Sequence, residues 1–364
     1  MKHLVLIFAE EIRLNSPFLN YILRVCNEKF ECDYELKFLD KLDKNTASFL
    51  EKCIAQFDYI TIFASSDNFY ITSKILASLN DDIIELKNGE ILAPSMSRKF
   101  ENGSFLIDIN GKFINVILAD PLQKLPNIFQ NFELNSKTFY IFDSDIITLK
   151  SRIDPLCETY EIKISITRIA PFLILIRASQ NRFGQIEAFM DSLKEFLNLK
   201  IINEKLENFI VSKLAFYGKK ITFAESCTAG LVAAKIGSVS GASEVFAGSL
   251  VTYSNEIKNI WLGVENEILN EHGAVSKECV NEMLSGAIES SGADFALAVS
   301  GIAGPTGGSE NKPVGTIYIG AKEKNGEEII ERFLLKGDRN YIREQSVTIA
   351  LCLLIKLKAK MFFD

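Results

Sequence analysis

The stretch KKITFAESCTAGLVAAKIG, residues 219–237, decides how the last part of this chain folds. KKITFA has the apolar run of a buried strand, and SCTAGLVAAKIG has the spacing of a helix that Ser226 would cap, with Thr228 in its first turn. Free N–H groups and the positive end of the helix dipole make such a helix start a natural anion site. An ordinary serine cap explains the same residues, so the motif alone leaves both interpretations open.

Alternating strands and helices predict a compact α/β layer over residues 203–364. ENFIVSKLAFYG reads as a helix that ends at Gly218. FAGSLVTY and DFALAVSG read as strands on either side of the helix SKECVNEMLSGAIESSG, and VGTIYIGAKE with EEIIERFLL reads as a hairpin around Asn325-Gly326. A final helix is expected over residues 338–357.

Two further domains are expected upstream. Residues 1–147 alternate buried strands such as HLVLIF, DYITIFA and INVILADP with amphipathic helices, which indicates a doubly wound parallel sheet with helices on both faces. In residues 148–202, YEIKISITRIA and FLILIRAS read as strands and QIEAFMDSLKEFLNL as a helix, which predicts a small α+β connector. A chain of 364 residues allows this division, because one core rarely grows beyond about 250–300 residues.

The composition argues against several classes of protein. No apolar run reaches the roughly 20 residues that span a bilayer, and the start of the chain is too soon acidic for a secretory signal, so a cytoplasmic location is expected. With a net charge of −7 and scattered Lys and Arg, the sequence shows no obvious basic face for nucleic acid. Two histidines exclude a multi-histidine metal centre, and seven cysteines without metal-ligand spacing read as buried free thiols.

The second candidate for a site is the loop SGIAGPTGGSENKPVGT, residues 300–316, which follows the apolar strand FALAV. Gly301, Gly304, Gly307 and Gly308 come in quick succession. Such density lets the backbone come close to a ligand and turn N–H groups toward a phosphate or an oxyanion. The loop is not a Walker motif, because no Gly-Lys-Ser/Thr ends it. A flexible hairpin-like loop is the alternative interpretation.

The third candidate is GASEVFAGSLVTYSNEIK, residues 241–258. Ser243 falls in a turn, Tyr253 closes a strand, and Lys258 lies one turn into a helix that Ser254 can cap. A serine nucleophile needs a base near its hydroxyl, and with histidine nearly absent a neutral lysine is the substitute. Burial would lower the lysine pKa enough for this role, and Tyr253 would pass the proton or steady the lysine. A surface lysine and a core tyrosine are the alternative.

Other residues are ambiguous from sequence alone. Cys227 sits at the expected helix start, where a thiol pKa can fall, but no histidine close in sequence supports a cysteine nucleophile. His272 would either orient a ligand or cap a helix end. Arg339 opens the last helix and is suited to clamp a phosphate, and Arg343 lies one turn further.

Taken together and in this order, AESCTAG, GSLVTYSNEIK, LGV, HGAVS, SGIAGPTGGSENKPVGT and GDR closely resemble the C-terminal domain of the competence/damage-inducible CinA family. The same domain also occurs alone as a nicotinamide mononucleotide amidohydrolase. The resemblance covers about residues 205–360. One departure is Ala229, where the family usually has a second glycine, and we expect little effect because an alanine fits the first turn of a helix.

The resemblance implies hydrolysis of the carboxamide of nicotinamide mononucleotide to the acid and ammonia, in pyridine nucleotide salvage, with no metal or organic cofactor. On the matching positions Ser243 would be the nucleophile, Lys258 its base and Tyr253 its helper, and Ser226 is the competing nucleophile. Other matching positions would bind the substrate: Ser226, Thr228, Ser300, Gly301, Gly304, Gly307, Gly308 and Arg339.

Residues 1–147 resemble the molybdopterin-binding-like domain that begins full-length members of the family, a domain linked there to metal-dependent cleavage of ADP-ribose. Three loops depart from the family pattern. Ala9-Glu10-Glu11 replaces Gly-Asp-Glu, Ala64-Ser65-Ser66-Asp67-Asn68 replaces Gly-Gly-x-Gly-Pro-Thr, and Leu118-Ala119-Asp120-Pro121 replaces Leu-Pro-Gly-x-Pro. Losing the glycines removes the close backbone approach that a phosphate needs. We therefore predict a degenerate scaffold for dimerisation, without pyrophosphatase activity.

Three functions stay open. The first is an amidase, expected as a homodimer that acts on a small nucleotide and has no nucleic acid or membrane partner. The second is a non-catalytic nucleotide-binding regulatory module, and the third is a bifunctional enzyme that retains ADP-ribose pyrophosphatase activity. Ser243, Tyr253 and Lys258 together favour the enzyme, because a module would need only the glycine loop, and the lost glycine-rich loops argue against the third function.

Overall fold

The computed structural model shows a mixed α/β protein, and it describes residues 2–30, 34–40, 45–87, 91–129, 136–181, 183–197 and 199–363. The chain divides into two compact units, residues 1–137 with 179–181 and residues 138–178 with 182–364. None of the described helices is long and apolar enough to cross a membrane.

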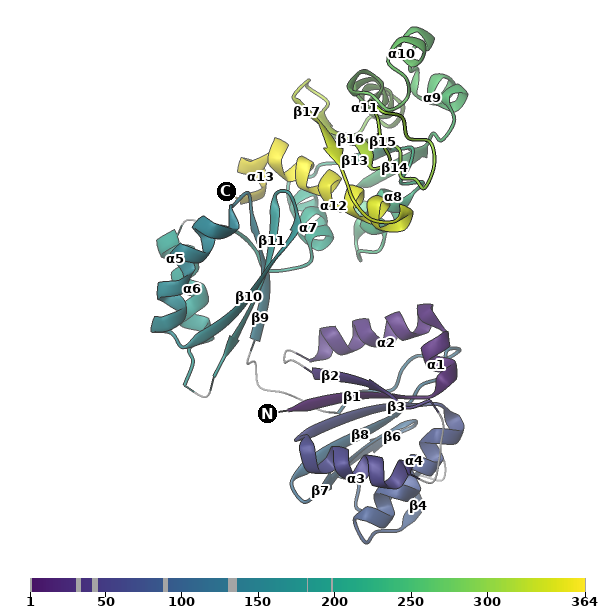
Figure 1. The fold of residues 1–364 in the computed structure, drawn as a ribbon, viewed down its shortest axis with the longest axis vertical. Coiled ribbons are helices and arrows are strands. Elements are labelled where there is room, and N and C mark those ends of the chain that lie inside the picture. The colour runs from purple at the N-terminus through teal and green to yellow at the C-terminus, as the bar shows by residue number, and fades with distance from the viewer. Residues whose placement is uncertain are drawn as a thin grey trace. The chain divides into compact units, whose positions relative to one another are not determined.

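The N-terminal unit is built on a six-stranded sheet in the order β2-β1-β3-β8-β7-β6 (Figure 1). The first four strands run parallel, and β7 and β6 are antiparallel to their neighbours. A separate two-stranded ribbon pairs β4 with β5. The elements are β1 (His3–Phe8), α1 (Glu10–Leu14), α2 (Ser16–Lys29), β2 (Tyr34–Phe38), α3 (Thr46–Gln56), β3 (Tyr59–Ala64), α4 (Ser66–Leu79), β4 (Ile84–Lys87), β5 (Ile91–Pro94), β6 (Lys99–Glu101), β7 (Ser104–Ile109) and β8 (Lys112–Leu118).

Both faces of this sheet are buried, which explains the nearly continuous apolar strands of the sequence. Val5 and Ile7 of β1 pack with α1 and α2, whereas Leu4, Leu6 and Phe8 pack with α3 and α4. Successive residues of a strand point to opposite faces, so one run of apolar residues supplies two cores. The doubly wound arrangement expected from the sequence is confirmed.

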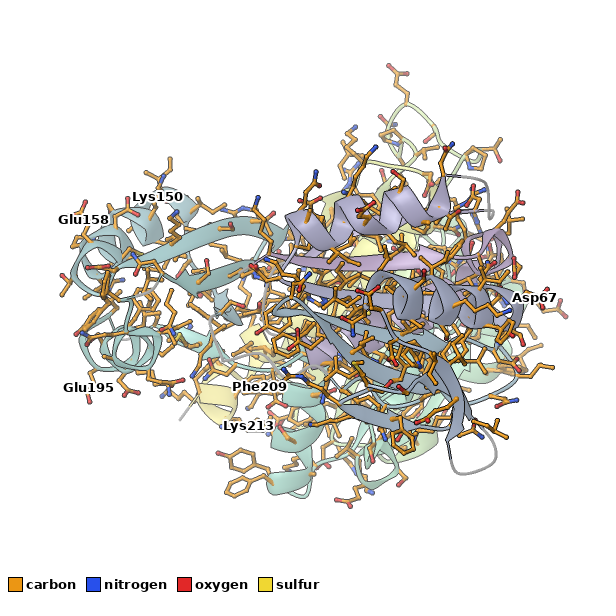
Figure 2. All side chains as sticks on the ribbon, turned by 90° about the horizontal axis from the view of Figure 1, so that it is seen from below. Asp67, Lys150, Glu158, Glu195, Phe209 and Lys213 are labelled. Carbon is orange, nitrogen blue, oxygen red and sulfur yellow. The ribbon has the colours of Figure 1, made fainter. Side chains whose placement is uncertain are left out.

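The connector is a four-stranded sheet in the order β10-β11-β9-β12, covered on one face by two helices. Its elements are β9 (Ser136–Phe142), α5 (Ile146–Thr159), β10 (Ile162–Ala170), β11 (Leu173–Gln180), α6 (Ile186–Leu197) and β12 (Lys200–Ile202). β9 belongs to this sheet although it precedes the expected boundary at 148. Lys150 and Glu158 on α5 and Glu195 on α6 project outward from the helices (Figure 2), while the opposite helix faces pack on the sheet.

The C-terminal layer is a five-stranded sheet in the order β14-β13-β15-β16-β17. β14, β13 and β15 are parallel, and β16 and β17 form the expected antiparallel hairpin. The elements are α7 (Leu206–Phe216), β13 (Ile221–Glu225), α8 (Leu231–Gly237), a 3-10 turn η1 (Ala242–Glu244), β14 (Phe246–Val251), α9 (Asn255–Leu262), α10 (Asn266–Glu271), α11 (Lys277–Ser291), β15 (Phe295–Gly301), β16 (Thr316–Glu323), β17 (Glu328–Leu334), α12 (Arg339–Leu357) and α13 (Ala359–Phe363).

Helices cover both faces of this sheet as well. Phe223 of β13 and Val299 of β15 pack with α7, α8 and α12, whereas the small residues Ala224 and Ala298 pack with α9 and α11. Small side chains on one face allow the helices that carry the candidate site to lie close to the strands.

The connector and the C-terminal layer share a core. The ring of Phe142 on β9 lies 5.8 Å from that of Phe363 on α13, and the ring of Phe209 on α7, labelled in Figure 2, lies 5.7 Å from the same residue. Ring contacts of this kind add to the burial of apolar area. The expected buried free thiols are confirmed for six cysteines, and Cys32 lies outside the described residues.

Candidate active site

Most candidate residues of the C-terminal layer, with the exception of Ser243, lie at one edge of its sheet. β13 ends at Glu225 and is followed by Ser226, β14 is followed by Tyr253, and β15 ends with Ser300 at its edge. The three strands are parallel, so their carboxyl ends meet at the same edge. Ligands of open α/β sheets bind outside the carboxyl ends of the strands, so a ligand site is expected at this edge.

A serine and a lysine lie in contact at this edge. The Nζ atom of Lys258 is 3.1 Å from Oγ of Ser226, and it lies 2.7 Å from the carbonyl oxygen of Thr252 and 3.3 Å from that of Tyr253. Ser254 caps α9 through the N–H of Ile257, as expected, and places Lys258 one turn into the helix. The cap therefore aims the lysine back across the end of β14 toward β13.

The surroundings of Lys258 favour a neutral amine. Its side chain is among the largest in the fully buried core, with 1% of its surface exposed, and burial lowers its pKa from the usual value. A neutral amine has two N–H donors and one lone pair. As an ammonium, Nζ donates to both backbone carbonyls and to Oγ of Ser226. As a neutral amine it keeps two donors for the carbonyls and can turn its lone pair to the hydroxyl of Ser226.

The turn after β13 differs from the expected helix start. α8 begins at Leu231 with Gly230 as its N-cap, so Ser226 does not cap a helix and the prediction that it does is wrong. The buried carboxylate of Glu225 accepts from the N–H groups of Gly230, Val232 and Ala233, at 2.9–3.1 Å. A carboxylate at a helix N-terminus is favourable, but it occupies the N–H groups that were expected to bind an anion. Glu225 was not among the residues singled out from the sequence, because its contacts depend on how the turn folds in three dimensions.

The structure does not bring Ser243 to Lys258. Ser243 lies exposed in η1, before β14 begins, whereas Lys258 follows the end of that strand. The six residues of β14 rise by roughly 20 Å, so the two side chains belong to opposite edges of the sheet. The structure therefore separates Ser243 from the lysine that was expected to be its base, whereas Ser226, the competing candidate, contacts that lysine.

Tyr253 and Arg339 form the outer part of the site. The guanidinium of Arg339 donates 2.8 Å hydrogen bonds to the Tyr253 hydroxyl and to the carbonyl oxygen of Gly304. Tyr253 is 57% exposed, and its carbonyl, not its hydroxyl, contacts Lys258. The tyrosine therefore joins the arginine to the site rather than passing a proton from the lysine.

The glycine loop lies at the same edge, but most of its glycines serve the packing of the loop itself. A Cβ at Gly301 would lie 2.3 Å from Ile317, and one at Gly308 would lie 2.8 Å from the backbone of Val314. Gly304 and Gly307 have φ of +84° and +90°, a region that favours glycine. At Gly301 and Gly308, the space that was expected to admit a ligand is instead filled by other atoms of the chain.

Side chains at the base of the loop hold it to the turn before α11. Ser300 donates to the carbonyl oxygen of Ala274 at 2.6 Å, and Lys312 donates to that of His272 at 2.8 Å. The imidazole of His272 lies 4.0 Å from the carboxylate of Glu278. It is thus the backbone of His272 that meets the loop.

Cys227 and Thr228 follow Ser226 in the turn. Burial raises the pKa of the Cys227 thiol to about 12, so this cysteine is a neutral thiol near pH 7 and not the activated nucleophile considered from the sequence. The Thr228 hydroxyl is buried and has no hydrogen-bond partner among the described residues. Arg343 contacts the backbone of both residues, donating to the carbonyl oxygens of Cys227 at 3.0 Å and Thr228 at 2.8 Å.

The N-terminal unit has a cavity at the corresponding edge of its own sheet. It measures about 440 Å³ and is lined by residues that follow β1, β3 and β8, among them Glu11, Ser65, Ser66, Asp120 and Pro121. These are the three loops in which the glycines are replaced. Throughout the described part of the chain, no group of three or more His, Cys, Asp or Glu side chains is placed to hold a metal ion.

The fold and the site define an α/β protein with a buried serine–lysine pair at the carboxyl edge of a mixed five-stranded sheet. Residues 203–358 match the family model described as the CinA C-terminal domain. The chain is 30% identical to a CinA-like protein of Leptospira biflexa over 341 residues, which cover 91% of this chain and 81% of that protein. The chain belongs to the CinA family.

Other relatives match a smaller part. A CinA-like protein of Thermosipho melanesiensis is 36% identical over 263 residues, 69% of this chain and 65% of that protein, so the chain spans just under two thirds of the length of this relative. The crystal structure of a competence/damage-inducible protein from Agrobacterium tumefaciens is 39% identical and covers 42% of this chain and 94% of its own, with a TM-score of 0.42.

Ala229 occupies a strained backbone position. Its φ is +49°, in the left-handed region, and the expectation of a helical first turn with little effect is therefore wrong. A non-glycine residue in this region is disfavoured by about 1–2 kcal/mol.

We expect Ala229→Gly to raise the free energy of unfolding of the C-terminal layer by about 0.5–1 kcal/mol, after allowing for the greater entropy of glycine in the unfolded chain. The single tryptophan, Trp261 on α9, reports urea unfolding of this layer by fluorescence. Ala234→Gly, at an exposed position inside α8, is the matched control and should lower stability by about 0.5–1 kcal/mol. Equal losses in both variants would contradict the strain at Ala229.

Proposed function

We propose that the C-terminal layer hydrolyses the carboxamide of nicotinamide mononucleotide, with Ser226 as nucleophile and Lys258 as its general base. The contact between Lys258 Nζ and Ser226 Oγ, buried and 3.1 Å long, carries this proposal. A neutral lysine beside a serine is a known substitute for histidine in hydrolases. The resemblance of residues 205–360 to the amidohydrolase domain supports the choice of substrate.

In the first half of the reaction, Lys258 takes the hydroxyl proton of Ser226 while Oγ bonds to the carboxamide carbon. The electron pair of the C=O bond moves to its oxygen and gives a tetrahedral oxyanion. When this collapses, the C–N bond breaks and the ammonium of Lys258 returns the proton to the leaving nitrogen, which departs as ammonia. The carbonyl oxygens of Thr252 and Tyr253 stabilise the ammonium between these steps.

In the second half, water replaces ammonia. Lys258, neutral again, takes a proton from a water molecule that attacks the acyl carbon, and the C–Oγ bond breaks as Ser226 regains its proton. The products are nicotinate mononucleotide and ammonia. The same amine serves both halves because it is held by two carbonyls that do not titrate.

Arg339 is suited to bind the phosphate of the substrate. Its guanidinium contacts two neutral oxygens and has no carboxylate partner among the described residues, so its charge is left for an anion. Thr228 follows β13, and Ser300 and the glycine loop follow β15 at the same edge of the sheet. A phosphate bound by Arg339 would favour a phosphorylated substrate over free nicotinamide.

We predict that Ser226→Ala and Lys258→Met each lower kcat for ammonia release from nicotinamide mononucleotide by about 1,000-fold or more, because each removes half of the nucleophile–base pair. Ser243→Ala is the matched control and should keep activity within about threefold, since its side chain lies at the other edge of the sheet. Activity that survives Ser226→Ala but not Ser243→Ala would return the nucleophile to Ser243. A folded parent that binds the nucleotide without releasing ammonia would favour the regulatory module.

The pH dependence should follow Lys258. Only the neutral amine accepts a proton, and burial lowers its pKa below the usual value of about 10.4, so kcat/KM should rise with pH and reach its half-maximum below that value. Activity is lost as the pH falls through the pKa of the folded state. A profile from pH 5 to 11 with fluorescence of Trp261 as the folding control tests this. A midpoint at or above 10.4 would contradict a buried amine as the base.

We further propose that the N-terminal unit has no ADP-ribose pyrophosphatase activity. The described residues that line its cavity include Glu11 and Asp120 but no lysine or arginine, so the cavity disfavours a diphosphate electrostatically. Incubation of the parent with ADP-ribose and Mg²⁺ or Mn²⁺ should yield no AMP above background. AMP formation that Asp120→Asn abolishes, while ammonia release persists, would establish the bifunctional enzyme instead.

A further inference from the structure

The turn from Ser226 to Gly230 leaves two backbone donors unused. The N–H of Ser226 donates to Val299, that of Ala229 to Ser226, and that of Gly230 to Glu225. Among the described residues no oxygen accepts from the N–H groups of Cys227 or Thr228, and the one at Cys227 meets only its own sulfur. Buried N–H groups are rarely left without an acceptor. Two free donors directly after a nucleophile are what an oxyanion needs.

Arg343 fixes the direction of one of these donors. Its Nε donates to the carbonyl oxygen of Cys227 at 3.0 Å, and this carbonyl shares a peptide plane with the N–H of Thr228. The two groups of a trans peptide point in opposite directions, so holding the carbonyl toward α12 turns the N–H away from it. Arg343 also donates to the carbonyl oxygen of Thr228 at 2.8 Å, which fixes the next plane, whose N–H closes the turn on Ser226.

No other charged side chain competes for Arg343. It makes no ion pair with a described carboxylate, and it also donates a 3.4 Å hydrogen bond to the side chain of Asn340. The planar guanidinium of an arginine can donate to two adjacent carbonyls in one fixed geometry. A lysine ammonium has freely rotating donors and does not fix the two carbonyls in the same way. On the opposite side of the turn, Glu225 occupies the helical N–H groups, so Cys227 and Thr228 are the donors that remain.

We propose that Arg343 is a positioning residue for an oxyanion hole beside Ser226: it orients the N–H of Thr228 directly, and that of Cys227 through the Ala229 N–H, which holds the carbonyl of Ser226. The inference rests on the proposed nucleophile. Arg343 does not touch the substrate in this scheme. It acts through the two peptide planes that it holds, and this sets it apart from Arg339, which contacts the outer part of the site.

The test uses a reaction that needs the oxyanion hole but not the proposed substrate. An alkyl fluorophosphonate reacts with an activated serine: Oγ bonds to phosphorus, fluoride leaves, and Lys258 takes the hydroxyl proton, while the phosphoryl oxygen occupies the oxyanion hole. Mass spectrometry of the full chain measures the rate of labelling at Ser226. We expect Arg343→Lys and Arg343→Ala to slow labelling by about 10–100-fold, with the matched control Arg168→Lys, which loses one backbone contact on β10, at the parent rate.

Two further measurements separate positioning from a general loss of structure. Millimolar guanidinium should restore labelling of Arg343→Ala at least tenfold, and with nicotinamide mononucleotide Arg343→Lys should lower kcat while KM and the pH midpoint stay within about twofold. Labelling that is unchanged in both variants, lost without guanidinium rescue, or absent from Ser226 in the parent overturns the inference. A parent that labels at Ser226 but releases no ammonia overturns the proposed substrate alone, and the labelling rates of the variants still decide the role of Arg343.

Discussion

The burial of one amine organises the C-terminal layer. Lys258 is enclosed almost completely, and burying a charge without partners is costly, so the surrounding chain must offer acceptors for every proton that the amine carries. The ends of β14 and β13 meet this requirement with the carbonyls of Thr252 and Tyr253 and the hydroxyl of Ser226. Both protonation states of the lysine are then hydrogen-bonded, which allows one group to accept and return a proton without rearrangement.

The turn after β13 shows how polar groups are divided between stability and chemistry. Glu225 satisfies the start of α8 from inside the protein, and Arg343 satisfies two carbonyls from the side of α12. Each of these hydrogen bonds joins a charged side chain to the backbone, and such bonds are stronger than those between neutral groups. These contacts leave the N–H groups of Cys227 and Thr228 without an oxygen acceptor among the described residues, next to the proposed nucleophile. A backbone held in this way would need no reorganisation when charge develops on a substrate oxygen.

The sequence predicted the layers, the hairpin and the last helix, because periodicity and turn residues are local properties. Prediction from the sequence failed where the position of a residue in the sheet determines which side chains come into contact. Ser243 and Lys258 are close in the sequence, but Ser243 precedes β14 and Lys258 follows it. The length of this strand places the two side chains at opposite edges of the sheet. Ser226 and Lys258 are 32 residues apart and in contact because β13 and β14 are parallel neighbours. Glu225, Arg343 and the left-handed Ala229 depend likewise on tertiary geometry that no local pattern reports.

The two doubly wound sheets of the chain show that topology supplies the place of a site and side chains supply its chemistry. In both, parallel strands end at a common edge and leave polar loops there. The C-terminal edge carries an amine in contact with a hydroxyl, and a guanidinium. These groups suit the carboxamide and the phosphate of the proposed substrate. At the N-terminal edge the residues that line the cavity include the acidic Glu11 and Asp120 and no lysine or arginine. Under the proposed function, selectivity within one chain would follow from the sign of charge at each edge rather than from the fold.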